Sequence, residues 1–429
     1  MALAKAPDRM VEVSMGGRVP SEADVVVIGA GAFGLSTAYF LAREGVGRVV
    51  VLDRYAPGSQ TSPRAAGLFK LIQGDELRTR LARLAIDTVL GFSEETGVPL
   101  AVERSGSLLI ARTEAHAALL LREAEHSRRW GVELELVDTT EVRRLAPYVE
   151  PNEIRAACWI PGDIYIDEPA SLLGAYQEAA AKRGVAICGH VPVTGIRARA
   201  GEVAGVVTAS GEIAAPVVID AAGAWAREVG RLAGAEVPIV PMRHQLYITE
   251  PVLGMRPSYP IARIIDVAVY VRPARGGIML GGFESDPLPL DPAGRGESFS
   301  MDDVPLDFAV LEQLTGLVDH NVPALRQASV QEHRGGLFTM TADGIFLVGP
   351  VPGVRGLWAL TGCNGSGFSF SPALGRVLAE WIVHGEPSLD IRALSPGRFS
   401  RQLSEDDLVA AAVWQYAHYY SPEGPELEA

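Results

Sequence analysis

One short segment near the start of the chain constrains the fold more than any other. Residues 24–29 have the β-branched composition of a buried strand, and the G-x-G-x-x-G turn of residues 29–34 leads into a helical stretch that Gly45 ends. A second β-branched run, residues 48–53, closes with an acidic residue. Strand, glycine-rich turn, helix and second strand in this order predict a β-α-β unit that binds a dinucleotide.

The three glycines of this turn have separate physical tasks. Gly29 permits the tight turn, Gly31 lets the backbone approach a pyrophosphate, and Gly34 lets the helix lie close against the strand. The helix N-terminus then faces the phosphates, and Asp53 stands where a carboxylate can accept both hydroxyls of an adenosine ribose. The alternative is an α/β core in which these glycines serve only turns.

A second glycine-rich turn decides between the common dinucleotides. Residues 344–349 and 357–361 predict two strands, and residues 362–367 then lead into a helix. We expect that helix from about Pro372 to Val383, with Gly385 after its end. A helix N-terminus near the pyrimidine edge of a flavin stabilises the reduced ring, whereas a nicotinamide enzyme seldom needs one. The sequence therefore favours FAD over NAD, with an ordinary loop and helix as the alternative.

Composition excludes several classes of protein. The 429 residues predict two or three domains, and 48% apolar with 21% charged residues exclude general disorder. The formal net charge of −14, without a basic stripe, argues against nucleic-acid binding. Residues 25–42 carry no charge, but their glycines fit a strand, turn and helix better than a membrane span.

The cysteines and histidines point to neither disulfides nor metals. Cys158, Cys188 and Cys363 are far apart and form no C-x-x-C pair, so neither a disulfide framework nor a thiolate metal site is indicated. The eight histidines lack metal-ligand spacing. We therefore expect no metal and a location in the reducing cytoplasm.

Two kinds of segment alternate along the chain. Residues 206–208 and 216–225 predict returns to the first sheet, whereas residues 268–272 and 277–281 have the pattern of antiparallel strands. A charged helix is expected at residues 114–130. We predict an α/β fold, α+β overall, with a Rossmann-type FAD-binding domain built from discontinuous segments and an inserted antiparallel-sheet substrate domain. The expected parts are a loose leader at 1–20, the FAD-binding domain at 21–100, 151–236 and 334–400, the substrate domain at 101–150 and 237–333, and a C-terminal extension at 401–429.

Several motifs together carry a family resemblance. Residues 25–34, 58–67, 220–225, 341–344 and 362–375 resemble the FAD-dependent D-amino-acid oxidase superfamily, and the resemblance covers about residues 22–400. Residues 244–251 and 270–284 are most similar to its sarcosine oxidase and dimethylglycine dehydrogenase branch. The motifs and the resemblance together imply an FAD-binding set of Gly29, Gly31, Ala32, Phe33, Gly34, Asp53, Arg54, Thr61, Ser62, Arg64, Ala65, Ala66, Gly67, Leu68, Pro192, Val193, Ala222, Gly223, Trp225, Gly362, Asn364, Gly365, Ser366, Gly367, Phe368 and Ser369.

Departures from the family pattern refine this expectation. Phe338 stands where glycine and D-amino-acid oxidases place an arginine that binds the substrate carboxylate. Arg64 stands where dimethylglycine dehydrogenases carry a flavin-linking histidine. No cysteine lies between Cys188 and Cys363, where monomeric sarcosine oxidases have a flavin-linking cysteine. We therefore expect FAD to be held non-covalently.

The resemblance implies an oxidation of an amine. A hydride passes from the carbon beside the nitrogen to flavin N5, and water hydrolyses the resulting imine; O2 or an electron-transfer protein then takes the electrons. We expect a secondary or N-methylated amino acid of the sarcosine or dimethylglycine type as substrate. The alternatives are a D-amino acid or an imino acid such as proline, or a non-catalytic assembly or electron-transfer subunit. The sequence leaves open whether the chain forms an oligomer.

Four side chains are candidates for the substrate site. Arg64 is implied by the resemblance to lie against the flavin, with a surface or phosphate-binding arginine as the alternative. Tyr270 and Arg272 share one face of a predicted strand, where an aromatic ring and a guanidinium suit an amine that carries a carboxylate; the alternative is a solvent-facing pair on an edge strand. His244 lies in a family-like segment and is equally well explained as a hydrogen-bonded domain-interface histidine. The aromatic tail, residues 414–420, is expected to cover this domain or a neighbouring subunit.

Overall fold

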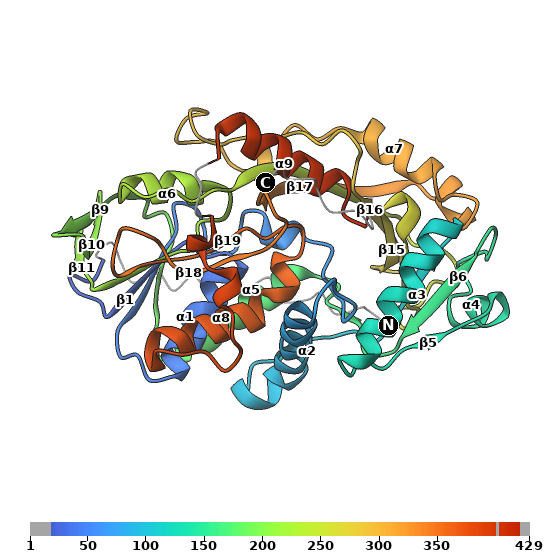
Figure 1. Cartoon of the computed structure of the whole chain (residues 1–429), viewed down its shortest axis with the longest axis horizontal. Coiled ribbons are helices and arrows are strands. Elements are labelled where there is room, and N and C mark those ends of the chain that lie inside the picture. Colours follow the sequence, from blue (N-terminus) through green and yellow to red (C-terminus); the bar gives the residue numbers. More distant parts are fainter. Residues whose placement is uncertain (1–18, 400–402, 421–429) are drawn as a thin grey trace, which may run out of the picture.

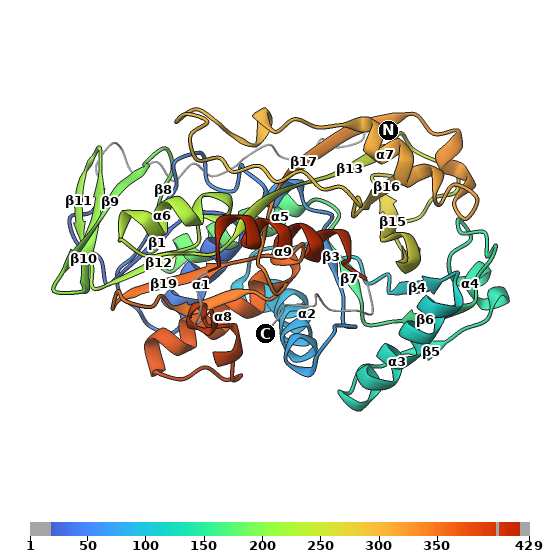
Figure 2. The ribbon, with the colours of Figure 1, turned by 45° about the horizontal axis from the view of Figure 1, so that its top comes forward.

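The computed structural model describes residues 19–399 and 403–420 (Figure 1). Most of the expected leader and the end of the expected extension therefore lie outside the described residues. Two large sheets dominate, at opposite ends of an elongated molecule (Figures 1 and 2). None of the helices within the described ranges combines the length and apolarity that a membrane crossing requires.

The first sheet is the predicted nucleotide-binding sheet. Its six strands run in the order β18-β19-β12-β1-β2-β8, and all neighbouring pairs are parallel except the edge pair β18–β19. Helix α1 connects β1 to β2, which confirms the β-α-β unit. The strands span Val25–Ile28 (β1), Val49–Leu52 (β2), Ala186–Cys188 (β8), Val217–Asp220 (β12), Leu347–Pro350 (β18) and Leu357–Thr361 (β19), and α1 spans Ala32–Arg43.

Both faces of this sheet are covered. Because strand side chains alternate, Val25 and Val27 enter a core with α1, α2, α5 and α8, whereas Val26 and Ile28 enter a core on the other face. A three-stranded antiparallel sheet, β11-β10-β9, covers that second face. The covering elements are α2 (Glu76–Thr96), α5 (Pro169–Lys182), α8 (Gly367–His384), β9 (Val193–Arg199), β10 (Glu202–Thr208) and β11 (Gly211–Ala214).

The expectation that residues 206–208 return to the first sheet is wrong. They belong to β10, which pairs with β9 and β11 instead. Their apolar pattern arises because one face of β10 packs against the face of the first sheet. Val206 is therefore fully buried although β10 does not pair with any strand of that sheet. Residues 217–220 do pair with β1, as expected.

The second sheet has eight strands in the order β17-β13-β16-β15-β14-β4-β6-β5, all antiparallel except β14–β4. Strands β15 and β16 form the expected antiparallel pair, and the charged helix is α3. The elements are β4 (Ser107–Ala111), β5 (Glu135–Leu136), β6 (Ala156–Ile160), β13 (Val240–Thr249), β14 (Ile261–Ile264), β15 (Val269–Ala274), β16 (Gly277–Gly282), β17 (Val330–Met340), α3 (Glu114–Arg129), α4 (Thr139–Leu145) and α7 (Phe308–Gly316). Strand β6 and most of β17 pair here although the sequence assigned them to the FAD-binding part, and the domain boundaries stay a prediction.

Helix α8 begins earlier than expected. It starts at Gly367, so Pro372 lies inside the helix and not in its first turn. Proline has no N–H to donate to the Phe368 carbonyl, and the Ser371 hydroxyl donates to that oxygen at 2.9 Å instead. The helix ends as expected at Gly385, which is left-handed. The N-terminus of α8 therefore directly follows the glycine-rich turn.

The C-terminal helix α9 (Glu405–Ala417) runs along the upper edge of the molecule in the view of Figure 1, beside β17. It packs on β13 and β17 through Leu408, Ala412 and Tyr416. The tail thus covers its own chain. The remaining α-helix is α6 (Ala226–Leu232), and β3 (Leu68–Phe69) and β7 (Ile164–Tyr165) form a short two-stranded sheet in the described part of the chain.

Asp163, between β6 and β7, joins three segments around β3. Its fully buried carboxylate accepts hydrogen bonds from the Leu71 backbone N–H at 2.7 Å, from the Ser107 hydroxyl, and from the Arg263 guanidinium at 3.2 Å. Because β3 leads directly into Leu71, this carboxylate fixes the chain where it passes from the first sheet toward the second.

We predict that Asp163→Ala strongly destabilises the protein. The substitution leaves the Arg263 side chain, only 2% exposed, without its carboxylate, and breaking a buried pair in this way costs about 3–5 kcal/mol. Chemical denaturation measures the loss. The matched control is Asp319→Ala, which breaks the surface pair with Arg326 and should change stability little. Equal stability of the two variants would contradict the role given to Asp163.

Candidate active site

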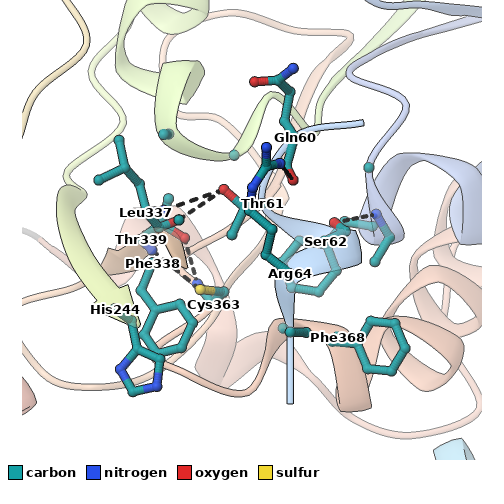
Figure 3. Close-up of a pocket in the computed structure, with 18 of the residues that line it drawn as sticks. Gln60, Thr61, Ser62, Arg64, His244, Leu337, Phe338, Thr339, Cys363 and Phe368 are labelled. Atoms are coloured by element: carbon teal, nitrogen blue, oxygen red, sulfur yellow. Dashed lines mark hydrogen bonds between the residues drawn. The ribbon is translucent and has the colours of Figure 1, made fainter. Parts of the chain in front are cut away.

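A single cavity extends from the α1 turn to the strands of the second sheet. At one end it is lined by the turn after β1 and the end of β2, and at the other by β13, β15, β17 and the residues after α9. Figure 3 shows its central part, where Ser62 and Arg64 come from the first sheet's side and His244 and Phe338 from the second. The cavity therefore joins the predicted nucleotide site to the predicted substrate site.

The α1 turn has the close contacts that its glycines predict. Gly29 has a φ of +106°, and a Cβ on it would lie 2.4 Å from the Ala221 carbonyl oxygen. A Cβ on Gly34 would lie 1.8 Å from the Gly29 carbonyl oxygen, so only glycine lets α1 approach the turn so closely. The first turn of α1 contains no acidic residue, which leaves its positive end available to a phosphate.

Asp53 anchors the other side of this end of the cavity. Its two carboxylate oxygens accept hydrogen bonds from the backbone N–H groups of Ala30 and Tyr55, each at 2.7 Å. Burial raises the pKa of Asp53 to about 6, although the two N–H groups favour the carboxylate. Next to it, the Arg54 guanidinium lies 5.8 Å from the ring centre of Trp225. The charge of Asp53 thus titrates close to neutral pH.

The second glycine-rich turn gives the cavity another helix N-terminus. The first turn of α8 has no acidic residue and no side-chain cap. A Cβ on Gly365 would lie 3.2–3.3 Å from the rings of Phe283 and Phe338, and one on Gly336 would lie 3.1 Å from Thr61. Two helix N-termini without acidic first-turn residues and glycine-lined walls in one cavity fit a dinucleotide that carries a flavin.

Most of the predicted FAD-binding residues line this cavity. They are Gly29, Gly31, Ala32, Phe33, Asp53, Arg54, Thr61, Ser62, Arg64, Ala65, Ala66, Gly67, Leu68, Val193, Ala222, Gly223, Trp225, Gly365, Ser366, Gly367, Phe368 and Ser369. Their contacts with FAD remain predictions.

Four predicted FAD-binding residues lie outside the cavity lining. Gly34 packs α1 on the turn, and Val191 lines the cavity where Pro192 was expected. Asn364 accepts hydrogen bonds from the Thr341 backbone and donates to the Gly362 carbonyl, so both residues shape the loop before α8 from behind.

Arg64 lies at the cavity wall, in the short helix Ser62–Arg64 (Figure 3). Its guanidinium donates to the backbone carbonyls of Ser59 and Gln60 and pairs with Asp302. These bonds tie the loop after β2 to the second half of the chain. The charge of Arg64 is partly balanced by Asp302, and its contact with the flavin remains a prediction.

His244 and Tyr270, two of the candidate residues, contact each other in the cavity wall. His244 Nε2 lies 3.0 Å from the Tyr270 hydroxyl and Nδ1 lies 2.6 Å from the Tyr416 hydroxyl, while the ring stacks on Phe338 at 4.2 Å. Burial lowers the pKa of His244 to about 3, so the imidazole is neutral at physiological pH. Both ring nitrogens are occupied by tyrosine hydroxyls. His244 therefore contributes a neutral aromatic wall.

The expectation that Arg272 binds a substrate carboxylate is not supported by its position. It shares a face of β15 with Tyr270, but two residues along a strand carry it about 7 Å away, and it does not line the cavity. Its fully buried guanidinium donates to the Ala66 carbonyl at 2.9 Å and to Asp167, and lies 4.4 Å from the ring centre of Tyr165. Arg272 holds the Ala66 loop in place.

Sequence reasoning missed Lys70, Phe283 and Tyr419, which all line the cavity. The Lys70 ammonium donates to the Tyr419 hydroxyl at 3.1 Å, and the Tyr419 ring stacks on Phe283 at 3.9 Å. A lysine inside the apolar run of residues 68–72 was a signal that could have identified Lys70. Phe283 and Tyr419 lie in segments that the sequence singled out, residues 270–284 and 414–420, but their place in the cavity depends on long-range contacts.

Comparisons with known proteins agree with this geometry. The model of the DAO family, described as FAD dependent oxidoreductase, matches residues 24–381. The chain is 32% identical over 393 residues to mouse mitochondrial sarcosine dehydrogenase, covering 90% of this chain and 42% of that protein. It is 30% identical over 391 residues to human mitochondrial dimethylglycine dehydrogenase, covering 88% of this chain and 44% of that protein. The chain thus spans less than half the length of both relatives.

Among solved structures, the fold is similar to that of L-proline dehydrogenase from P. horikoshii. The TM-score is 0.81 at 25% identity, covering 89% of this chain and 99% of that chain. This likeness confirms the predicted fold class.

We predict that FAD affinity depends on the charge of Asp53. Ribose hydroxyls donate to a carboxylate, so binding favours the ionised form. With a pKa of about 6 in the free protein, Asp53 has to lose a proton on binding at lower pH, and affinity should fall as pH drops through 6. Titration of the apoprotein with FAD, followed by flavin fluorescence, measures this dependence.

Asp53→Ala should remove this pH dependence. Above pH 7 it should weaken FAD binding about tenfold to a hundredfold, because that is the loss in affinity expected when one charge-assisted hydrogen bond is removed. The matched control is Asp24→Ala, which removes a carboxylate from the opposite end of β1, where it pairs with Arg48. Its FAD affinity should equal that of the wild type. An unchanged affinity in Asp53→Ala would show that this carboxylate does not bind the ribose.

Proposed function

The chain belongs to the DAO family of FAD-dependent oxidoreductases, and we propose that it oxidises the carbon–nitrogen bond of a secondary or N-methylated amino acid. The residues around the α1 turn, with Asp53, would hold the adenosine half of FAD, and the N-terminus of α8 the flavin half. When bound, FAD accepts the two electrons of the oxidation. The protein's own residues bind and orient the amino acid and exclude water.

The observation that carries this proposal is the aromatic wall around Phe338. Phe338 stacks on the neutral ring of His244 and lies 6.4 Å from the ring centre of Phe283, and Tyr270 closes the same end of the cavity. Rings of this kind receive N-methyl groups and alkylated amines by apolar and cation–π contact. An arginine at position 338 would instead bind a carboxylate. The wall therefore favours a substrate with carbon on its nitrogen.

Lys70 is the residue we assign to the substrate carboxylate. It lines the same end of the cavity, and among the described residues it forms no ion pair with a carboxylate. Its one hydrogen bond goes to the Tyr419 hydroxyl. An ammonium without a carboxylate partner gains more binding free energy from a substrate carboxylate than an ammonium that is already paired with Asp or Glu. Lys70 thus takes the role that Arg272 was expected to have.

The relatives support the same substrate class. Two of them carry the names sarcosine dehydrogenase and dimethylglycine dehydrogenase, and both of those substrates are N-methylated amino acids with a free carboxylate. The similarity to L-proline dehydrogenase favours a second candidate, a cyclic imino acid, which is also a secondary amine. Both candidates fit a carboxylate at Lys70 and carbon against Phe338.

A panel of amines tests the proposal. The holoprotein is mixed anaerobically with sarcosine, N,N-dimethylglycine, proline or D-alanine, and bleaching of the flavin absorbance is followed. We expect rapid bleaching by at least one of the first three and slow or no bleaching by D-alanine, because a primary amine leaves the aromatic wall unfilled. Rapid bleaching by D-alanine alone would contradict the proposal.

We predict that Lys70→Met weakens substrate binding. Loss of a charge-assisted contact to the carboxylate should raise the substrate Kd about tenfold to a hundredfold, while methionine retains the apolar stem. The dependence of the anaerobic bleaching rate on substrate concentration gives the Kd. Lys182→Met is the control, because Lys182 pairs with Glu178 on the solvent-exposed face of α5 and its loss should leave the Kd unchanged. An unchanged Kd in Lys70→Met would exclude Lys70 as the carboxylate-binding residue.

A further inference from the structure

The residues after α9 complete the cavity, although they lie beyond residues 24–381 that the family model matches. Tyr416 bonds His244, and Tyr419 and Tyr420 line the cavity itself. Figure 2 shows α9 crossing from the first sheet toward β15 and β16, which brings its C-terminal end to the substrate site. This chain thus adds groups to the site from a segment outside the family region.

Tyr419 is held rigidly within this site. Its ring stacks on Phe283 with an interplanar angle of 11°, and its hydroxyl lies 3.1 Å from Lys70 Nζ and 2.9 Å from Ser366 Oγ. The Lys70 ammonium is also 5.0 Å from the centre of the Tyr419 ring. Lys70 donates to the hydroxyl oxygen, and Ser366 is placed to do the same. Both neighbours therefore stabilise a negative charge on that oxygen.

The groups around Tyr419 lower the pKa of its phenol. Burial opposes ionisation, but the Lys70 ammonium and the hydrogen bonds from Ser366 and Lys70 outweigh burial and lower the pKa of the phenol below its ordinary value. Other titratable groups surround Lys70 and Tyr419. The cations and aromatic groups are Arg78 on α2, Arg263 on β14, Tyr270 on β15, His244 on β13, Tyr416 on α9 and Tyr420 after it. The carboxyl groups that interact with them are Glu123 on α3, Asp163 before β7 and Glu284 after β16.

We propose that Tyr419 is the catalytic base that removes a proton from the ammonium group of the bound amino acid. The proposal rests on the function assigned above, since it needs a substrate with an amine and a carboxylate at this end of the cavity. An amino acid carries a protonated nitrogen at neutral pH, and its lone pair must be freed before the adjacent C–H bond can be oxidised. In this step a substrate N–H bond breaks, the Tyr419 O–H bond forms, and no electrons leave the substrate.

Lys70 makes this transfer electrically neutral. Before binding, the Lys70 ammonium faces the Tyr419 phenolate; after binding, it faces the substrate carboxylate, and the phenolate has been neutralised by the ammonium proton. One cation thus exchanges one anion for another, so no unpaired charge is left in the site. His244 does not provide an alternative base, because both of its ring nitrogens already contact tyrosine hydroxyls.

Tyr419→Phe tests the proposal, because it removes the hydroxyl and keeps the ring on Phe283. With the holoenzyme, the rate of anaerobic flavin reduction at neutral pH should fall about a hundredfold or more, as expected for loss of a general base. The rate should recover as pH rises and the substrate supplies its own free amine. The matched control is Tyr259→Phe, whose hydroxyl is remote from the cavity and whose pH profile should equal that of the wild type.

A second measurement needs no substrate turnover. The ultraviolet tyrosinate band of the substrate-free holoenzyme should show one phenol that titrates below the ordinary tyrosine pKa of about 10, absent in Tyr419→Phe and shifted upward in Lys70→Met. Binding of N,N,N-trimethylglycine, which brings a carboxylate but no ammonium proton, should make Tyr419 take up a proton from solvent and reduce this band.

The two measurements separate the inference from the proposed function. If no amine in the panel reduces the flavin but the low-titrating phenol is present, the proposed function fails and the assignment of Tyr419 as an ionised base stands. If the phenol titrates in the ordinary range, or if Tyr419→Phe retains the wild-type rate and pH profile with a competent amine, the inference is overturned.

Discussion

The substrate site depends on one electrostatic constraint: among the described residues, no Asp or Glu carboxylate pairs with the Lys70 ammonium. Its ammonium lies at the junction of the two large sheets, just after β3, where Asp163 fixes the next residue through the Leu71 backbone. Within residues 19–399 and 403–420, the Lys70 ammonium pairs with no carboxylate; it donates to the Tyr419 hydroxyl and lies over the rings of Tyr419 and Tyr420. A cation in such surroundings favours an anionic ligand. The cavity is thereby suited to an amino acid and less so to a simple amine.

Electrostatics divides the cavity into two functional ends. At the nucleotide end, the N-terminus of α1 provides positive potential and Asp53 a carboxylate, which suits phosphates beside a ribose. At the substrate end, the neutral His244 ring and its aromatic neighbours exclude water without adding charge. The N-terminus of α8 lies between them, where a flavin ring would need a positive potential on reduction.

The sequence predicted the nucleotide end well because that end depends on local backbone geometry. Gly34 approaches Gly29 within one turn, and β2, which ends before Asp53, pairs with β1 across a single helix, and local patterns report such contacts. The substrate end depends on long-range contacts: Arg272 is drawn to Asp167, and Tyr419 reaches Lys70 from the far end of the chain. The packing of β10 on the face of the first sheet was missed for the same reason.

The central claim is that an amino acid binds with its carboxylate at Lys70 and its N-alkyl groups against Phe338. A crystal structure of the FAD-loaded protein with N,N,N-trimethylglycine tests this most directly. We predict a carboxylate oxygen about 3 Å from Lys70 Nζ and the methyl groups facing Phe338 and His244. A carboxylate bound instead at Arg64, or methyl groups turned away from the aromatic wall, would contradict the account.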